Sequence, residues 1–286
     1  MLERACREHF AGANALYTNF INNDLEAVRQ AKDGGLHVVH ELIIGADVGR
    51  ILLEERRQYP GVELQSESEH EVENGIDRDR QKWALSDQVL VPSEYCWHSS
   101  LALGCDPAKL SFVPYGIPEH WFDLQPKPHC GRVLFVGQVG LRKGNHVLAE
   151  ACRILKARGV AYECRVAGPP QADVTHPLFE GPTYLGQVPR IQVQEEFICA
   201  DFFVLPTLAD SFGLVHLESM ACGVSVITTP NCGSVVRDGV DGFIVPIRDA
   251  SALADRMQQL VQNRLLRRQM AWECFGDRLL SALRVY

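Results

Sequence analysis

In the second half of the chain, short apolar runs alternate with stretches in which apolar residues recur every three or four positions. The run Arg132–Gly137 is largely apolar and ends on glycine, which is typical of a strand buried in a parallel sheet. The next stretch has the period of a helix, and we expect Asn145 to cap it and Gly159 to end it. Further strands are expected at residues 164–168, 184–186, 202–206, 225–228 and 242–246, and further helices at 191–199, after 213, after 233 and after 249.

This alternation of strands and helices predicts an α/β fold with a doubly wound, parallel, Rossmann-like sheet. Ligands of such sheets bind beyond the carboxyl ends of the strands. We therefore expect the loops after Gly137, Gly168, Gly186 and Pro206 to meet at one cleft.

The first half of the chain is less regular. Helices are predicted at residues 24–32 and 51–58, and a strand followed by a loop at 36–44. Residues 62–79 are rich in glutamate and serine, which indicates a solvated loop or an exposed helix rather than an acceptor site. The segment 123–129 contains two prolines and is interpreted as a linker between two domains.

The composition limits the classes of function. The chain has 286 residues, of which 46% are hydrophobic, enough for one large or two modest cores. A net charge of −8 without a long basic run argues against a nucleic-acid partner. The 10 cysteines form no C-x-x-C pair, so we expect buried thiols and a cytoplasmic location. The sequence shows no metal-ligand motif and no apolar run long enough to span a membrane, and we expect no signal peptide.

The segment from Asp210 to Glu218 carries the strongest candidate chemistry. Its two carboxylates lie eight positions apart, with a Phe212-Gly213 pair between them. We expect Gly213 to open a helix whose first N–H groups and dipole bind a diphosphate. Glu218 would then lie roughly 7–8 Å along the axis from the helix start. An amphipathic helix with two surface acids is the alternative interpretation of this segment. His216, which lies within the helix, is interpreted as a residue that packs in the interior.

This run, together with the Ala-Cys-Gly turn and the β-branched strand after it, resembles the acid-seven-residues-acid signature of retaining glycosyltransferases of the GT-B fold, in glycosyltransferase family 4. The resemblance implies that Asp210 contacts the transferred sugar and that Glu218 holds the ribose of the nucleotide. The diphosphate would lie on the amides of Phe212, Gly213 and Leu214. The family usually has glutamate at the first acid, and the aspartate of this chain is one methylene shorter.

The loop that follows Gly137 also resembles the family pattern, in which it supplies cations to the donor diphosphate. Lys143 matches the family's lysine, and its charge would stabilise the departing nucleotide diphosphate. The family's usual arginine is replaced by Gln138, so Arg142 is the candidate for the second cation. A solvated loop lysine is the alternative interpretation of Lys143.

The turn after Gly186 resembles the loop that cups the nucleobase in this family. By this resemblance Val188 packs on the face of the base. For Arg190, a structural turn before the next helix is an equally good interpretation.

The resemblance covers the chain from about residue 20 onward and implies a partial N-terminal, acceptor-side domain at residues 1–128. It further implies a nucleotide-sugar-binding domain at 129–269 and a helix at 270–286 that crosses back to the first domain. The implied activity is that of a retaining hexosyltransferase (EC 2.4), which moves a sugar from a nucleotide-diphosphate sugar (UDP or GDP) to a glycan or lipid-linked acceptor in polysaccharide biosynthesis. No cofactor and no metal is implied, and association with the inner membrane face is left open. Because the first domain is expected to be shortened, the alternative is a non-catalytic nucleotide-sugar-binding fragment or interaction module.

Overall fold

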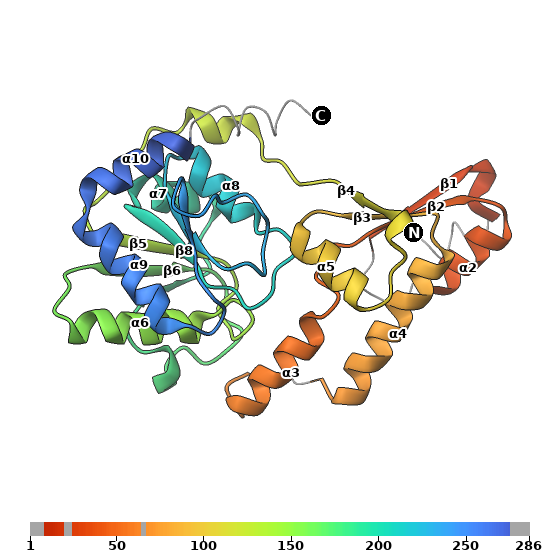
Figure 1. Cartoon of the computed structure of the whole chain (residues 1–286), viewed down its shortest axis with the longest axis horizontal. Coiled ribbons are helices and arrows are strands. Elements are labelled where there is room, and N and C mark those ends of the chain that lie inside the picture. Colours follow the sequence, from red (N-terminus) through yellow and green to blue (C-terminus); the bar gives the residue numbers. More distant parts are fainter. Residues whose placement is uncertain (1–8, 20–24, 64–66, 275–286) are drawn as a thin grey trace. The chain divides into compact units, whose positions relative to one another are not determined.

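The computed structural model describes residues 9–19, 25–63 and 67–274. Their contacts divide them into two compact units (Figure 1). Within the described residues, the first unit comprises positions up to 53 and from 67 to 114, and the second comprises 54–63 and everything from 115 onward. Residues 115–128 thus group with the second unit, whereas the boundary predicted from the sequence follows residue 128.

A four-stranded parallel sheet forms the centre of the first unit, in the order β1-β2-β3-β4 (Figure 1). The spatial order follows the chain, so these four strands contain no point at which the strand order reverses. The strands are β1 (Ala15–Thr18), β2 (His37–Glu41), β3 (Gln88–Val91) and β4 (Leu110–Phe112). The helices are α2 (Leu25–Asp33), α3 (Val48–Gln58, whose last residues count with the second unit), α4 (Glu69–Leu85) and α5 (Glu94–Ala102), with the 3-10 helices η1 (His9–Gly12) and η2 (Pro107–Lys109).

The polar stretch predicted at residues 62–79 contains the start of helix α4. The Ser68 hydroxyl accepts from the Glu71 N–H (3.3 Å), while the Glu71 carboxylate accepts from the Ser68 N–H (2.7 Å). This capping box explains why a run rich in serine and glutamate is helical. The helix continues to Leu85 and is buried towards its end, where Trp83 belongs to the core.

The second unit is built on a six-stranded parallel sheet in the order β10-β9-β8-β5-β6-β7. The predicted doubly wound parallel sheet is therefore confirmed, and its strand order reverses between β5 and β8. The strands are β5 (Arg132–Val136), β6 (Glu163–Ala167), β7 (Thr183–Gly186), β8 (Phe202–Leu205), β9 (Val226–Thr228) and β10 (Gly242–Ile244). The helices are α6 (Asn145–Ala157), α7 (Arg190–Cys199), α8 (Leu214–Ala221), α9 (Ala250–Gln262) and α10 (Arg264–Cys274), with the 3-10 helices η3 (Glu119–Asp123) and η4 (Pro177–Phe179).

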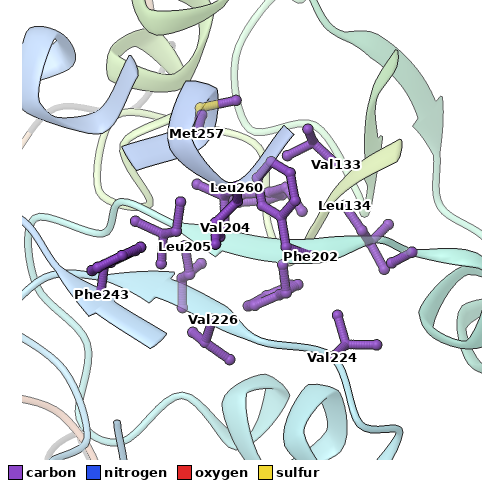
Figure 2. Close-up of a cluster of buried hydrophobic side chains, with 14 of the residues drawn as sticks. Val133, Leu134, Phe202, Val204, Leu205, Val224, Val226, Phe243, Met257 and Leu260 are labelled. Atoms are coloured by element: carbon purple, nitrogen blue, oxygen red, sulfur yellow. The ribbon is translucent and has the colours of Figure 1, made fainter. Parts of the chain in front are cut away.

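Helices cover both faces of this sheet, which is why its central strands β5 and β8 are apolar apart from Arg132 at the start of β5. Every residue of β8 is buried. On one face, the Phe203 ring lies 5.5 Å from the Phe197 ring of α7, measured between centroids. Met257 and Leu260 of α9 belong to the same buried cluster, as Figure 2 shows. The apolar strand β8 is thus buried between two layers of helices, and this burial stabilises the second unit.

Three local predictions have different outcomes. Asp249 caps α9 as predicted, because its carboxylate accepts from the Ala252 N–H (2.8 Å). Asn145 is not a cap but the first residue of α6, and its Oδ1 accepts from the Gly140 N–H (2.9 Å) in the preceding loop. The short helix predicted after residue 233 is wrong, since turns fill the connection between β9 and β10. Of the predicted C-terminal helix at 270–286, residues 275–286 lie outside the described residues.

The predicted thiols are confirmed for the described cysteines, none of which forms a disulfide. All of them are buried except Cys130, which is exposed, and Cys199, which is half-buried. Within the described residues, no helix is long and apolar enough to cross a membrane.

Candidate active site

The site is built where the strand order of the second unit reverses. The loops after β5 and β8 meet there, because the two strands are neighbours in the sheet. The Leu208 N–H donates to the carbonyl of Arg142 (2.9 Å). Gly144 packs so closely that an added Cβ would lie 1.9 Å from the Pro206 carbonyl oxygen. In open α/β sheets, such a reversal is where ligands bind.

The loops after β6 and β7 adjoin the same edge of the sheet. The Gly137 N–H donates to the Ala167 carbonyl (3.0 Å), and the Gly168 N–H donates to the Gly186 carbonyl (2.8 Å). An added Cβ on Gly168 would lie 1.8 Å from the carbonyl oxygen of Gly137. These loops meet at one edge of the sheet, as predicted, and main-chain contacts hold them together. The cleft expected there stays a prediction.

Lys143 and Asp210 form an ion pair across this reversal. The ammonium of Lys143, from the loop after β5, donates to Oδ2 of Asp210, from the loop after β8. Both side chains are nearly buried, with exposed fractions of 13% and 12%. Burial alone would raise the pKa of Asp210, but the charge and hydrogen bond of Lys143, followed by the charge of Arg142, lower it below its usual value. Asp210 is therefore a fixed carboxylate that faces two cations.

Arg142 completes the positive side of this pair. Its Nη1 lies 3.7 Å from Oδ1 of Asp210 and donates to the Ala209 carbonyl (3.2 Å). Its Nη2 donates to Oε1 of Gln138 (3.4 Å). The glutamine at the position where the family usually has arginine therefore contacts Arg142. The structure thus brings together Arg142, Lys143 and Asp210, three of the residues selected from the sequence.

Helix α8 begins directly after Gly213, as predicted. Gly213 has φ 71° and ψ 68°, a left-handed conformation that favours glycine, and no side chain caps the helix. The first turn of a helix has N–H groups without intrahelical acceptors. Leu214 is 43% exposed, whereas Phe212 is buried with its ring centroid 5.4 Å from that of Tyr115. Phe212 therefore packs in the core, whereas Leu214 lies at the surface.

Glu218 lies one turn into α8 with its side chain 14% exposed. Burial raises the pKa of its carboxyl group, and the charge of Arg190 opposes part of this rise. Arg190 begins α7; its Nη2 lies 3.6 Å from Oε1 of Glu218, and its guanidinium lies 5.8 Å from the centre of the Trp121 ring. The sequence left Arg190 undecided, because nothing in the local pattern links α7 to α8. Val188 lies half-buried in the loop just before α7.

His216 is a core residue, as interpreted from the sequence. Its Nε2 shares a hydrogen bond with the Thr228 hydroxyl (3.0 Å), and its Nδ1 lies 3.7 Å from the Cys232 sulfur. Complete burial lowers the pKa of His216 to about 4, although the nearby Asp210 carboxylate acts in the opposite direction. His216 is therefore neutral at physiological pH and faces the core.

Glu63 is a further residue at this edge that sequence reasoning did not select. Its carboxylate accepts from the Leu141 N–H (2.7 Å), in the loop that carries Lys143. The sequence offered no signal for it, because a glutamate in an acidic stretch is usually solvated. Among the described residues, no group of three or more His, Cys, Asp or Glu side chains is arranged to hold a metal ion.

Comparisons with known proteins agree with this arrangement. Residues 130–263 match the model of the family described as glycosyl transferases group 1. The amylovoran biosynthesis glycosyltransferase AmsK of Erwinia amylovora is 27% identical over 276 residues, which cover 89% of this chain and 60% of the relative. The D-inositol 3-phosphate glycosyltransferase of Paenarthrobacter aurescens is 24% identical over 281 residues, which cover 90% of this chain and 66% of the relative. The chain thus spans less than two thirds of the length of these curated relatives.

Solved structures show the same fold. Sucrose-phosphate synthase from Thermosynechococcus elongatus has a TM-score of 0.73 at 20% identity, covering 99% of this chain and 75% of that structure. HepE from Anabaena in complex with UDP has a TM-score of 0.71 at 14% identity, covering 99% of this chain and 77% of that structure. The fold is accordingly the α/β fold of the GT-B glycosyltransferases, and residues 130–263 of the second unit are similar to the glycosyl transferases group 1 family.

Proposed function

We propose that this chain is a glycosyltransferase that moves a sugar from a nucleotide-diphosphate sugar to a glycan or lipid-linked acceptor, with retention of configuration. The observation that carries the proposal is the Lys143–Asp210 pair, which lies at the strand-order reversal after β8 and is followed directly by the uncapped start of α8. Relatives named as glycosyltransferases support transferase activity and do not favour a non-catalytic interaction module. The HepE structure that contains UDP supports a nucleotide as part of the donor.

In this proposal, the donor diphosphate lies on Lys143, Arg142 and the amides of Phe212, Gly213 and Leu214. A dianionic diphosphate fits two cations and a helix N-terminus, where the partial positive charge of the helix dipole lies. Without donor, the Lys143 ammonium is held by Asp210. The phosphate oxygens would compete for that ammonium while Asp210 turns to the hydroxyl groups of the sugar.

Glu218 is assigned to the ribose and Val188 to the nucleobase. A nearly buried carboxylate one turn into α8 can accept hydrogen bonds from vicinal hydroxyl groups, provided that it is ionised. Val188 lies half-buried just before Arg190, the neighbour of Glu218, and so can offer an apolar surface to a base beside the ribose.

The chemical step would be a front-face substitution. The bond between the anomeric carbon and the phosphate oxygen breaks, the acceptor oxygen bonds to the same face of that carbon, and the acceptor proton passes to the departing phosphate. Lys143 and Arg142 would stabilise the charge that grows on this phosphate. The proposal includes no cofactor and no metal, and it places the reaction in the cytoplasm, at the inner membrane face when the acceptor is lipid-linked.

The test is a calorimetric titration of the chain with UDP and with GDP, followed by an assay of donor hydrolysis with a panel of sugar nucleotides. We expect one nucleotide to bind, and Lys143→Ala to weaken its binding by about tenfold or more, as loss of a charge-assisted hydrogen bond predicts. Lys156→Ala, on the exposed surface of α6, is the matched control and should leave the affinity unchanged. A folded wild-type chain that binds neither nucleotide would refute the proposal.

A further inference from the structure

Residues 54–63, the end of α3 and the loop after it, belong by their contacts to the second unit. Two carboxylates of this segment, Glu55 and Glu63, have exposed side-chain fractions of only 1% and 8%. Buried carboxylates are costly unless they are paired, so their partners indicate why they are there.

Glu63 is bound on both carboxylate oxygens. Its Oε1 accepts from the main-chain N–H of Leu141 (2.7 Å), and its Oε2 accepts from Nε of Arg56 (3.1 Å). The main chain of Glu63 also forms an antiparallel bridge with Ala172, in the loop after β6. Glu63 therefore joins the loops after β5 and β6 at the edge of the sheet where the site lies.

The close approach of Glu63 depends on Gly140. A Cβ added to Gly140 would lie 2.6 Å from Oε1 of Glu63, so any side chain there would displace the carboxylate. The neighbouring N–H of Gly140 is held separately by Oδ1 of Asn145 (2.9 Å). Two successive amides of the loop thus have dedicated side-chain acceptors.

Glu55 holds the other end of the same loop. Its Oε1 lies 2.7 Å from Nε2 of His146, the second residue of α6, and its Oε2 accepts from Nε of Arg248 (2.6 Å). Burial would raise the pKa of Glu55, but the hydrogen bonds and charges of His146 and Arg248 lower it. The ring of Tyr59 lies 5.0 Å from that of His146, between centroids, and closes the contact.

Arg142 and Lys143 lie between these two attachments. A lysine or arginine side chain is flexible, and a cation binds a phosphate more tightly when the main chain beneath it is already fixed. Leu141 is fully buried, so its N–H loses a buried hydrogen-bond acceptor if Glu63 is removed.

We propose that Glu63 is a positioning residue for the nucleotide diphosphate: by accepting the Leu141 N–H, it fixes the loop that presents Arg142 and Lys143 to the phosphates. This inference rests on the proposed function of the site. It adds a residue from the segment after α3 to a site that the sequence placed entirely after residue 137.

The experiment compares Glu63→Ala, Glu63→Gln and Glu54→Gln. Glu54 lies on the same segment, its side chain is 69% exposed and its carboxylate pairs with Arg248, so it is the matched control. Calorimetry with UDP and GDP should show about tenfold weaker binding for Glu63→Ala, a smaller loss for Glu63→Gln, which keeps an acceptor oxygen, and no loss for Glu54→Gln. A purely structural role would lower the melting temperature of Glu63→Ala but leave the affinity of the folded protein unchanged, and that result would overturn the proposal.

Amide hydrogen exchange provides a readout that does not depend on nucleotide. In Glu63→Ala, exchange at residues 139–146 should accelerate while the helices of the second unit keep their protection. If wild type binds neither nucleotide, the proposed function fails, while faster exchange in this loop would still show that Glu63 fixes it. Unchanged exchange in the loop would refute the role of Glu63 whatever the nucleotide result.

Gly140→Ala provides an independent check, because it displaces the Glu63 carboxylate without altering it. We expect this variant to lose about as much nucleotide affinity as Glu63→Ala, and the double variant to lose little more than either one. Losses that simply add would show that the two residues act separately, contrary to the proposal.

Discussion

The Lys143 ammonium donates a hydrogen bond to the Asp210 carboxylate and forms an ion pair with it, although the two residues lie 67 positions apart in the sequence. One belongs to the loop after β5 and the other to the loop after β8, the two neighbouring strands between which the strand order reverses. Each charge is therefore held by the fold at the place where a ligand of this sheet is expected. This pair gives the site its preformed geometry.

Breaking one side of the Lys143–Asp210 pair should destabilise the second unit. Lys143→Ala leaves a nearly buried carboxylate with the more distant Arg142 and the Ser211 N–H as neighbours, so we expect a loss of about 1–3 kcal/mol in the free energy of unfolding, less than for a fully buried pair. Asp210→Ala should cost a similar amount. Urea unfolding of both variants and of the double variant measures the coupling, and a double variant whose loss equals the sum of the two would show that the pair contributes nothing.

Replacing Glu218 should weaken nucleotide binding without unfolding the chain. Glu218→Gln removes the charge that accepts ribose hydroxyl groups, so the binding free energy should fall by about 1–3 kcal/mol. Glu195→Gln, an exposed position on α7, is the control and should bind like wild type. Equal affinities for Glu218→Gln and wild type in a UDP or GDP titration would remove Glu218 from the site.

Nucleotide affinity should depend on the protonation of Glu218. Burial raises the pKa of Glu218 above its usual 4.5, so the folded state favours the neutral acid. The contribution of this group to the free energy of unfolding is therefore fully present below pH 4.5 and is lost as pH rises through the raised pKa. Ribose binding needs the ionised form, so affinity should fall as pH decreases through that same raised pKa. Titrations at several pH values with Glu218→Gln as comparator isolate this effect, because the ligand's own protonation is common to both; identical pH profiles would contradict it.

His216 should make the second unit sensitive to mild acid. Its folded pKa is lowered from 6.5 to about 4, so the stability that comes from keeping it neutral is present above pH 6.5 and lost as pH falls towards 4. The loss across this window should approach about 3 kcal/mol. Urea unfolding at pH 7 and pH 5 should show a smaller difference in His216→Gln than in wild type, and an equal difference would show that His216 is not the responsible group.

Gly144→Ala should destabilise far more than Gly159→Ala. Both glycines have left-handed φ, 71° and 68°, so an alanine pays a similar conformational cost of about 1 kcal/mol at either position. At Gly144 the new Cβ would also lie 1.9 Å from the Pro206 carbonyl, whereas nothing lies within 4 Å at Gly159. Thermal unfolding compares them directly, and equal melting temperatures would show that the loops after β5 and β8 are not in close contact.

Much of the second unit could be predicted because its signals are local. Apolar runs with glycine at the end give the strands, and the capping of α9 by Asp249 and the opening of α8 by Gly213 follow from short-range chemistry. The prediction for Asn145 failed because its side chain accepts from the Gly140 N–H in the preceding loop instead of capping α6. The stretch at 62–79 contains the start of an exposed helix, as predicted, but its composition does not reveal that Glu63 is buried.

The sequence by itself determined the order of strands and helices and the residue types that could handle a diphosphate, since both depend on periodicity and on the spacing of charges along one segment. Only the tertiary structure decided which of those charges meet. The pairing of Lys143 with Asp210, of Glu218 with Arg190 and of Glu63 with the Leu141 N–H joins segments that no local pattern connects. Such contacts depend on which strands lie side by side in the sheet, and that arrangement results from burying the apolar strands between helices.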